Sequence, residues 1–502
     1  MLEKIQSPKD LEDLSKSELI LLAKEIRERI VTVVGNNGGH LASNLGVVDL
    51  TIALHRVFNN SQDAIIWDVS HQCYAHKILT GRNNQFDTLR KKNGLSGFTK
   101  NIESPYDWFD AGHSSTSIST ALGLLAGRDL LHSEGKVVAV IGDGALTGGM
   151  AFEALSHVGQ LHKNLVIVLN DNQMSISSNT GAISKYLGHL TTTPQYQSFR
   201  YNVDRFVDKI PFLGKPLTRF IFKFKRGIKS IVFPNNLFSD LGLEYVGPLN
   251  GHHIGDLITV FERVKKLDRP VVVHVVTQKG RGYGPSEKDP VTFHGVGPFN
   301  TLTGKVPVSN KKTFTQVFSD KIVELGERDS RVVAITAAMT TGTGLDSFAE
   351  KFPHRFFDVG IAEQHAVTFA AGLARSGIKP VVAIYSTFIQ RAVDQLIHDI
   401  ALQKLPAIFV LDHSGPVSED GETHQGIFDI SLLRPVPNVS LLSPATKTQL
   451  EKSLEWAISE NVPVIIRYPK GTCPKEVPEF NAPIEKGRGL LVPNKVGKSD
   501  IL

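Results

Sequence analysis

The sequence predicts an α/β protein with two large domains, each built around a mostly parallel sheet. In the N-terminal half, apolar runs at residues 137–141 and 165–169 flank a segment with helical spacing at residues 150–155. This pattern is typical of a β-α-β unit, in which the crossover returns the chain to a parallel neighbour. A second series of alternating strand and helix patterns begins after residue 312. Such alternation predicts sheets that carry helices on both faces.

The first domain is expected to open with helices. Apolar positions at helical spacing predict a helix over residues 17–34, followed by a Gly-rich turn at 35–39 and a second helix ending near Val57. Strand and helix patterns then continue to about Pro298, except at residues 185–236. There, segment 220–226 has the composition of a membrane-surface helix. Amphipathic helices are common in soluble proteins, so we interpret the region as a mobile segment folded over the domain.

A Gly- and Pro-containing polar run predicts a linker after the first domain. In the second domain, strands are predicted at residues 332–336, 381–385, 407–411, 439–442 and 464–468. After Lys470 the chain becomes rich in Pro and Gly. We therefore divide the chain into a first domain (1–300), a linker (301–312), a second domain (313–475), and a stretch (476–502) that would open a further domain.

Composition excludes several functional classes. With 502 residues, 41% of them hydrophobic, the chain can bury large cores. Its 55 basic and 50 acidic residues give a net charge of +5 that is spread along the chain, so nucleic-acid binding is not indicated. Cys73 and Cys473 are far apart, which fits a reducing compartment. Without a targeting segment or an apolar run near 18 residues, a soluble cytoplasmic protein that does not bind membranes is expected.

Two polar groups end the strands of the predicted β-α-β unit. Asp143, within Gly142-Asp143-Gly144, follows the first apolar run, and Asn172 follows the next. Ligands of open α/β sheets bind beyond the carboxyl ends of the strands, so both side chains should face one crevice. A carboxylate and an amide oxygen suit Mg²⁺, and the glycines allow the backbone to approach a bulky anion. The pattern predicts a metal-diphosphate site, although an ordinary turn remains the alternative for so short a motif.

A candidate proton-handling group lies in the second domain. Glu363 stands at a predicted strand-to-helix junction among Ile361, Ala362, Ala366 and Val367. A carboxyl group in apolar surroundings tends to stay protonated, so it can share a proton with a ring nitrogen. The alternative is a carboxylate placed at a helix N-terminus because the helix dipole favours it there.

Long segments from Gly38 to Lys470 resemble the 1-deoxy-D-xylulose-5-phosphate synthase family of the transketolase superfamily, in the family's order. The matching segments are GGHLASNLGVVDLTIALH from Gly38, WDVSHQCYAHKILTGR from Trp67, GHSSTSIS from Gly112, IGDGALTGGMAFEAL from Ile141, LNDNQMSIS from Leu169, KGRGYGPSEKDPVTFH from Lys279, VGIAEQHAVTFAAGLA from Val359, YSTFIQRAVDQLIHD from Tyr385 and DGETHQGIFD from Asp420.

The resemblance implies a fold and an activity. Members have three α/β domains, and the third is absent or only begun here. They bind thiamine diphosphate and Mg²⁺ between the first two domains and work as homodimers. They condense pyruvate with D-glyceraldehyde 3-phosphate, releasing CO2, through a carbanion/enamine on the cofactor. The product serves the biosynthesis of isoprenoid precursors, thiamine and pyridoxal.

The resemblance also implies residue roles. The catalytic set is Glu363, which would activate the cofactor, with His40 and His424 handling substrate protons. The metal ligands are Asp143, Asn172 and the main chain of Met174. Contacts to the cofactor are implied for His71, Gly112, His113, Ser114, Gly144, Ala145, Asn172, Tyr283 and Glu363, and contacts to the acceptor substrate for Tyr385, Arg391, Asp420 and Arg467.

Three departures from the family pattern leave alternatives open. Asp412 is followed by His413, where the family usually has an Arg that anchors the acceptor phosphate; imidazole offers fewer donors and no fixed charge. Ala75 replaces a common Pro, and the chain ends where the third domain would begin. The alternatives are another thiamine-diphosphate ketol transferase, a decarboxylating carboligase of 2-oxoacids with a different acceptor, or an inactive fragment.

Overall fold

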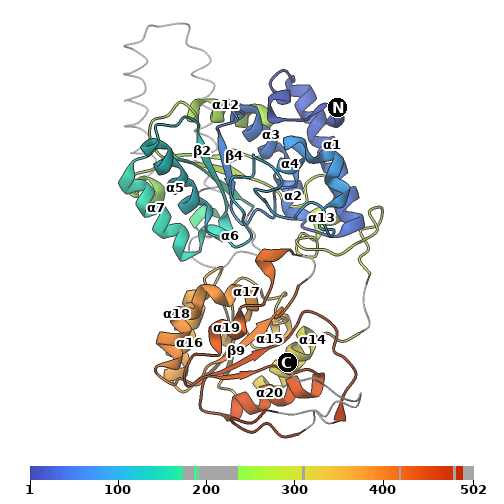
Figure 1. Cartoon of the computed structure of the whole chain (residues 1–502), viewed down its shortest axis with the longest axis vertical. Coiled ribbons are helices and arrows are strands. Elements are labelled where there is room, and N and C mark those ends of the chain that lie inside the picture. The colour runs from blue at the N-terminus through green and yellow to red at the C-terminus, as the bar shows by residue number, and fades with distance from the viewer. Residues whose placement is uncertain are drawn as a thin grey trace.

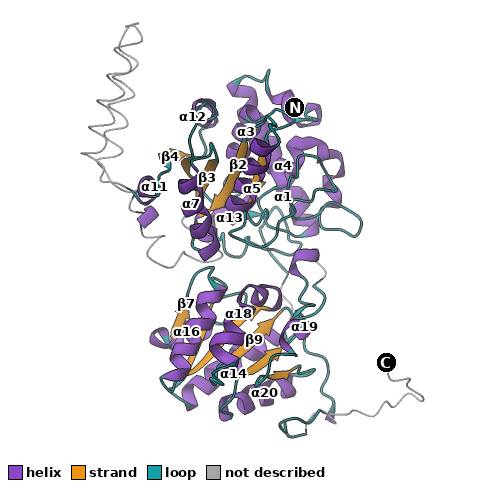
Figure 2. Ribbon diagram, turned by 60° about the vertical axis from the view of Figure 1, so that its left-hand side comes forward, coloured by secondary structure: helices purple, strands orange, loops and turns teal. Residues whose placement is uncertain are grey.

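The computed structural model describes residues 1–172, 186–188, 190, 236–307, 311–417, 420–478 and 482–489. It contains two bodies, coloured blue to green and yellow to red in Figure 1. In each, helices cover both faces of a sheet (Figure 2), as expected for an α/β fold. Segment 220–226 and most of the predicted break at 185–236 lie outside the described residues.

The first sheet has the strand order β1-β2-β3-β5-β4, and every pair of neighbours is parallel. Its strands are β1 (Ala64–Trp67), β2 (Val137–Gly142), β3 (Val166–Asp171), β4 (Glu244–Asn250) and β5 (Val271–Val276). The predicted β-α-β unit is confirmed as β2, α7 (Gly149–Leu161) and β3, with Val138 opposite Val166. Two neighbouring strands therefore deliver Asp143 and Asn172 to one edge.

Alternate residues of these strands enter two different cores. Ile141 and Leu169 pack with α5 (Ser117–Leu130) and α7 on one face, whereas Val140 and Val168 pack with α3 (Val48–Val57) and α12 (Ile254–Val264) on the other. The period of two that every strand imposes on its side chains explains this division. Because both faces are covered, the strands are apolar throughout rather than alternating.

The N-terminal helices differ from the prediction at their ends. Helix α1 (Lys16–Asn37) continues past the predicted end, so Gly35 lies inside it, where an added Cβ would stand 2.2 Å from Cγ2 of Thr301. The chain turns at Gly38 instead, which has a φ of +75°. The predicted second helix is divided at Val47 into α2 (Ala42–Gly46) and α3.

The second sheet has the order β10-β11-β9-β8-β6-β7 and is also parallel throughout the described residues. Its strands are β6 (Val332–Thr336), β7 (Phe356–Asp358), β8 (Lys379–Tyr385), β9 (Ile408–Asp412), β10 (Ser440–Leu442) and β11 (Val464–Arg467). The five predicted strands are all present, and β7, at the edge of the sheet, is the strand expected before the helix that Glu363 begins. One face packs against α14 (Phe314–Arg328) and α20 (Lys447–Ser459), and the other against α16 (Glu363–Arg375).

Shorter helices complete the two bodies. The α-helices are α4 (Tyr74–Lys77), α6 (Asp143–Leu146), α11 (Leu237–Asp240), α13 (Gly284–Lys288), α15 (Asp346–Lys351), α17 (Ser386–Ile389), α18 (Val393–Gln395) and α19 (Asp429–Leu433). The remaining turns are η1 (Leu2–Lys4), η2 (Pro8–Leu11), η3 (Ile78–Arg82), η4 (Asn83–Thr88), η5 (Pro353–Arg355), η6 (Gln390–Ala392), η7 (Leu396–Ala401) and η8 (Glu422–His424). None of the helices in the described ranges is both long and apolar enough to cross a membrane.

Candidate active site

A cleft of about 590 Å³ lies between the two domains and is lined by residues from both. The first domain contributes residues that follow β2, β3 and β5, namely Asp143, Asn172 and Lys279. The second contributes Tyr385 from the end of β8 and His413 from just after β9. The carboxyl ends of both sheets thus open onto one space, where open α/β sheets place their ligands.

Asp143 begins α6 at one end of the cleft and is 3% exposed. Burial and the neighbouring Asp171 carboxyl raise the pKa of Asp143 to about 8. Behind it, His274 Nε2 lies 3.0 Å from Asp171 Oδ2, and its Nδ1 lies 2.7 Å from the Tyr245 hydroxyl. This chain of contacts fixes the carboxyl groups. A cation placed here would favour the ionised carboxylates and so relieve the electrostatic cost of packing them together.

Lys279 reaches the same end of the cleft from the segment after β5 and is 8% exposed. Burial lowers the pKa of its ammonium group to about 8, although the Asp143 carboxyl acts in the opposite direction. A partly charged amine, a carboxylate and the Asn172 amide therefore converge where a diphosphate and a divalent cation could be held together.

Three histidines of the first domain line the middle of the cleft. The rings of His40, His71 and His294 contact one another with centroid distances of 5.2–5.7 Å. Ser43 Oγ lies 3.1 Å from His71 Nε2 and 3.3 Å from His294 Nδ1, so it joins two of the rings. Burial lowers the pKa of His40 to about 3 and keeps the other two well below the usual value. At neutral pH the three imidazoles are uncharged hydrogen-bonding groups.

Glu363 lies on the second domain's wall of the cleft, at the first position of α16. It is 4% exposed, and its Oε2 atom has no hydrogen-bond partner among the described residues. Burial raises the pKa of this carboxyl above its usual range, while the Arg391 guanidinium acts in the opposite direction. A buried carboxyl without a protein partner is suited to hold a proton for a ligand in the cleft.

Charged groups from both domains meet around Asp420. Its carboxylate lies 2.9 Å from Arg90 Nη2 of the first domain and 3.8 Å from Lys470 Nζ of the second. Burial opposes ionisation of Asp420, but the neighbouring His40, Arg90 and Lys470 more than offset it and lower its pKa to about 2. Nearby, the His424 ring is stacked on Phe98 of the first domain at 4.9 Å. This cluster offers hydroxyl and phosphate groups both acceptors and cations.

The departure from the family pattern, His413, lies in this part of the cleft. Its ring is stacked on Tyr385 at 3.9 Å, and its Nδ1 lies 2.9 Å from Asp412 Oδ1. The Tyr385 hydroxyl donates to the Gly342 carbonyl at 3.3 Å. Both rings face the cleft, so His413 occupies a wall where a guanidinium would otherwise add a charge.

Most predicted site residues surround this cleft. Those that line it are His40, His71, Gly112, Ser114, Asp143, Gly144, Ala145, Asn172, Glu363, Tyr385, Asp420 and His424. Gly112 is pressed against the second domain, since an added Cβ would lie 2.2 Å from Thr423 Oγ1. The loop that carries it therefore tolerates no side chain at that position.

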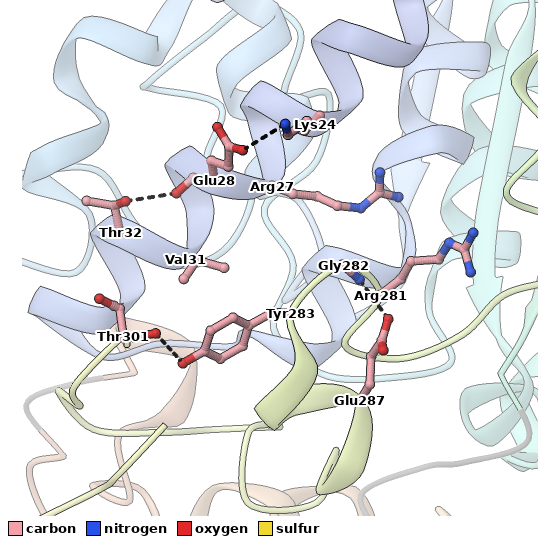
Figure 3. Close-up of a pocket in the computed structure, with 10 residues that line it drawn as sticks. All are labelled: Lys24, Arg27, Glu28, Val31, Thr32, Arg281, Gly282, Tyr283, Glu287 and Thr301. Carbon is pink, nitrogen blue, oxygen red and sulfur yellow. Dashed lines mark hydrogen bonds and ion pairs between the residues drawn. The ribbon is translucent and has the colours of Figure 1, made fainter. Parts of the chain in front are cut away.

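Four predicted residues do not line the cleft. His113 Nε2 donates to the Thr423 carbonyl of the second domain at 3.0 Å, and Arg391 donates to Ser114 of the first. Arg467 donates to Asp429 Oδ2 at 2.8 Å. Tyr283 lines a different cavity, of about 670 Å³, between α1 and the segment 281–287, where its hydroxyl donates to the Thr301 carbonyl (Figure 3). Met174 lies outside the described residues.

Several other residues of the cleft were not predicted from the sequence, among them four with basic side chains. They are Arg90, Lys279, His294 and Lys470. Lys279 and His294 stand at the two ends of KGRGYGPSEKDPVTFH, so that motif contained the signal for them. Arg90 and Lys470 gain their positions from the approach of the two domains, for which the sequence offers no local pattern.

The cleft fits thiamine diphosphate and a divalent cation. Its two sides carry different groups. Asp143, Asn172 and Lys279 of the first domain suit a diphosphate and a cation, whereas Glu363 Oε2 of the second domain, which has no hydrogen-bond partner among the described residues, suits a ring nitrogen. No group of three or more His, Cys, Asp or Glu side chains within the described ranges could hold a metal by itself. A cation here could take phosphate oxygens of the cofactor among its ligands, as Mg²⁺ accepts.

Comparisons with known proteins place the chain in a family. The family model described as 1-deoxy-D-xylulose-5-phosphate synthase matches residues 2–277, and that of the transketolase pyrimidine-binding domain matches residues 310–475. The 1-deoxy-D-xylulose-5-phosphate synthase of Treponema pallidum is 55% identical over 98% of this chain and 78% of its own length. That of Carboxydothermus hydrogenoformans is 55% identical over 94% of this chain and 76% of its own. A transketolase structure from Leishmania mexicana is 16% identical, with a TM-score of 0.41 over 92% of this chain and 78% of that one.

Proposed function

Because the chain belongs to the 1-deoxy-D-xylulose-5-phosphate synthase family, we propose that it joins pyruvate to D-glyceraldehyde 3-phosphate with loss of CO2. The product is 1-deoxy-D-xylulose 5-phosphate, a precursor for isoprenoid, thiamine and pyridoxal synthesis. The observation that carries this proposal is the cleft itself, in which Asp143 and Asn172 of one domain face the same space as Glu363 of the other. Thiamine diphosphate, when bound, supplies a thiazolium carbon that acts as nucleophile and electron sink.

The first domain is proposed to hold the charged part of the cofactor. Asp143 and Asn172 provide hard oxygen ligands for Mg²⁺, with the main chain of Met174 as a further ligand. Lys279 adds a cation for the phosphate oxygens, and Gly112 keeps the loop before Ser114 close to the second domain. Residues 1–300 therefore act as the diphosphate domain and residues 313–475 as the pyrimidine domain, with 301–312 as the linker.

Glu363 is proposed to activate the cofactor. Its carboxyl is buried, carries a raised pKa and leaves Oε2 unpartnered, so it can share a proton with a ring nitrogen of the aminopyrimidine. Glu363 is itself 4% exposed, and a buried setting of low dielectric strengthens such a hydrogen bond. Glu363 is the only acid assigned a role here that lies in α16 of the second domain.

Proton transfer and acceptor binding are assigned to the histidines and to the Asp420 cluster. His40 and His424 are uncharged at neutral pH because their pKa values are lowered to about 3 and about 4, so each offers one N–H donor and one acceptor nitrogen. The aldehyde oxygen of the acceptor must gain a proton when the new carbon–carbon bond forms, and these groups lie in reach of it. Tyr385, Asp420, Arg90 and Lys470 position the hydroxyl and phosphate groups.

His413 favours a second candidate function, that of a carboligase that uses the same chemistry with another aldehyde acceptor. Its ring fills the wall beside Tyr385 without the fixed charge of a guanidinium. Lys470 and Arg90 lie at the same end of the cleft and supply positive charge there. We therefore favour the phosphorylated acceptor.

The experiment measures CO2 release from carboxyl-labelled pyruvate by the purified chain with thiamine diphosphate and Mg²⁺. Addition of D-glyceraldehyde 3-phosphate is expected to accelerate release and to yield one pentulose phosphate for each CO2. Equal acceleration by unphosphorylated D-glyceraldehyde would favour the second candidate. Absence of release with every aldehyde would contradict the proposal.

We also propose that the chain forms a homodimer and acts in the cytoplasm. The exposed apolar side chains Ile397 and Leu402, which are 44% and 68% exposed, support an additional contact surface on the second domain. The two free cysteines, Cys73 and Cys473, support a reducing compartment. Light scattering on the purified chain should give twice the mass of 55.0 kDa, and a monomer at micromolar concentration would contradict the dimer.

A further inference from the structure

We propose that Arg391 is a positioning residue that fastens the second domain to the cofactor loop of the first and governs how the Glu363 carboxyl holds its proton. The inference rests on the proposed function, in which Glu363 is the activating acid. It replaces the expectation that Arg391 contacts the acceptor, because the guanidinium does not line the cleft.

Both ends of the Arg391 guanidinium are engaged across the domain boundary. Arg391 lies in η6, on the second domain, with 13% of its side chain exposed. Its Nη1 donates to Ser114 Oγ and its Nη2 donates to the Ser114 carbonyl, each at 2.9 Å. A planar guanidinium held at two points has a fixed orientation, which a lysine ammonium cannot reproduce. The contact therefore sets the position of the loop that contains Gly112 and Ser114 relative to the second domain.

The same guanidinium faces Glu363. Arg391 Nη1 lies 3.8 Å from Glu363 Oε2, the atom without a hydrogen-bond partner among the described residues. At this distance the charge acts on the carboxyl without occupying the oxygen, which stays available to a ligand. The domain contact and the electrostatic control of the acid are thus made by one side chain.

Other ionisable groups lie around Arg391 rather than around Glu363. Burial raises the pKa of Asp68 and lowers that of His113, both of the first domain, and the Arg391 charge acts downward on each. Asp68 is itself held by the backbone N–H groups of Ser115 and Ser117 at 2.7 and 2.9 Å. Among the described residues, Arg391 is the charged side chain whose field acts on the pKa of Glu363, against the effect of burial. Loss of the positive charge should therefore raise that pKa.

The test separates charge from hydrogen bonding with two variants. Arg391→Gln keeps an amide donor for Ser114 but removes the charge, and Arg391→Lys keeps the charge but loses the two-point contact. The readout is the infrared band of the protonated Glu363 carboxyl in the cofactor-free protein, assigned by its absence in Glu363→Gln and followed against pH. Arg391→Gln is expected to raise the midpoint by about one pH unit, the lower end of the effect of one neighbouring charge. Arg391→Lys should leave it close to wild type.

Lys100→Met is the matched control, since Lys100 also contacts the second domain, through Glu422 at 3.1 Å, but lies outside the cleft lining. It should leave the Glu363 midpoint unchanged. In turnover assays, Arg391→Gln should move the alkaline limb of the pH profile of kcat to higher pH. Arg391→Lys should lower kcat but leave that limb at the same pH. If Arg391→Gln does not fold, Arg391→Met is titrated in the same way.

A wild-type midpoint in the uncharged variants would overturn the inference, as would an equal shift in Lys100→Met. The titration requires no turnover, so it is independent of whether the wild-type chain makes 1-deoxy-D-xylulose 5-phosphate. Failure of the proposed function would appear instead as a wild-type chain without CO2 release but with the expected carboxyl shifts.

Discussion

The two domains share an architecture but place different chemistry at the ends of their strands. In the first, the sheet end carries Asp143, Asp171 and Lys279, all buried, beside the three cleft histidines, so it is a cluster of polar groups that act on one another. In the second, Glu363 stands in an apolar setting with one oxygen unpartnered. The difference teaches that one fold can present a cluster of interacting polar groups or a single buried acid, depending on a few residues at the strand ends.

The contacts between the domains come from loops and short helical turns rather than from the strands. His113 and Ser114 of the first domain bond to Thr423 and Arg391 of the second, and Arg90 pairs with Asp420. Each of these contacts lies beside the cleft. These few polar residues therefore set the distance between the strand-end residues of the first domain and Glu363 of the second. Substitutions in either domain can test the two sets of residues separately.

The largest expected effect is on the second domain's acid. Glu363→Gln should lower kcat by about 10²–10⁴-fold, because the amide cannot exchange a proton with the cofactor ring. Cofactor affinity in the presence of Mg²⁺, measured by fluorescence titration, should change little. Full activity in this variant would remove Glu363 from the mechanism and erase the contrast between the domains.

Asp143→Asn should give the reverse pattern. Replacing the carboxylate at the end of β2 removes a charged metal ligand, so Mg²⁺-dependent cofactor affinity should fall by about 100-fold or more. Saturating cofactor and Mg²⁺ should recover part of the turnover, unlike in Glu363→Gln. Titrations with and without EDTA distinguish the two variants, and an unchanged affinity would place the diphosphate elsewhere.

The polar interior of the first domain should make it sensitive to acid. His55 is 2% exposed, and burial keeps its pKa well below 6.5. The folded state therefore binds fewer protons than the unfolded state, and the stability supplied by neutral His55 is present above pH 6.5 and lost as the pH falls below it. The difference in unfolding free energy between wild type and His55→Asn should narrow by about 1.4 kcal/mol for each pH unit below 6.5.

Urea unfolding at pH 7.5 and 5.5, followed by circular dichroism, measures this difference. His398→Asn in the second domain is the control, because His398 is on the surface, where the hydrogen bond with Asp399 raises its pKa, so its gap from wild type should not narrow as the pH falls. A gap between wild type and His55→Asn that stays constant with pH would show that His55 titrates alike in the folded and unfolded states, which would contradict the lowered pKa.

The smallest expected effects distinguish the two lysines of the cleft. Lys279→Met should weaken cofactor binding by about tenfold and leave the KM for the acceptor unchanged, whereas Lys470→Met should raise that KM by about tenfold. Tyr283→Phe, which removes a hydrogen bond outside the cleft, should change neither constant. If the two lysine variants changed cofactor affinity and the acceptor KM equally, Lys279 would not be specific to the cofactor nor Lys470 to the acceptor.

Much of the fold follows from local patterns in the sequence. The strand cores were predictable because long apolar runs with both faces covered leave a clear signal, as at Val137 and Val464. The end of α1 was not, because Gly35 reads as a turn residue, yet it fits inside the helix where Thr301 packs closely.

The site was predictable where its residues end neighbouring elements. Asp143 and Asn172 follow adjacent strands of one β-α-β unit, so their convergence is a property of local topology. Arg391 and Arg467 could not be assigned in the same way, since their partners, Ser114 and Asp429, are chosen by tertiary packing. Lys470, three residues after Arg467, reaches the cleft instead. The spacing of residues along the chain does not predict which of two nearby basic side chains, Arg467 or Lys470, lines the cleft.

The most direct measurement is a crystal structure of the chain with thiamine diphosphate and Mg²⁺. The account predicts that the diphosphate and metal lie against Asp143 and Asn172, while the Glu363 carboxyl of the same chain is within hydrogen-bond distance of the aminopyrimidine ring. A cofactor whose ring meets Glu363 of a second copy, or whose diphosphate lies away from Asp143, would contradict it.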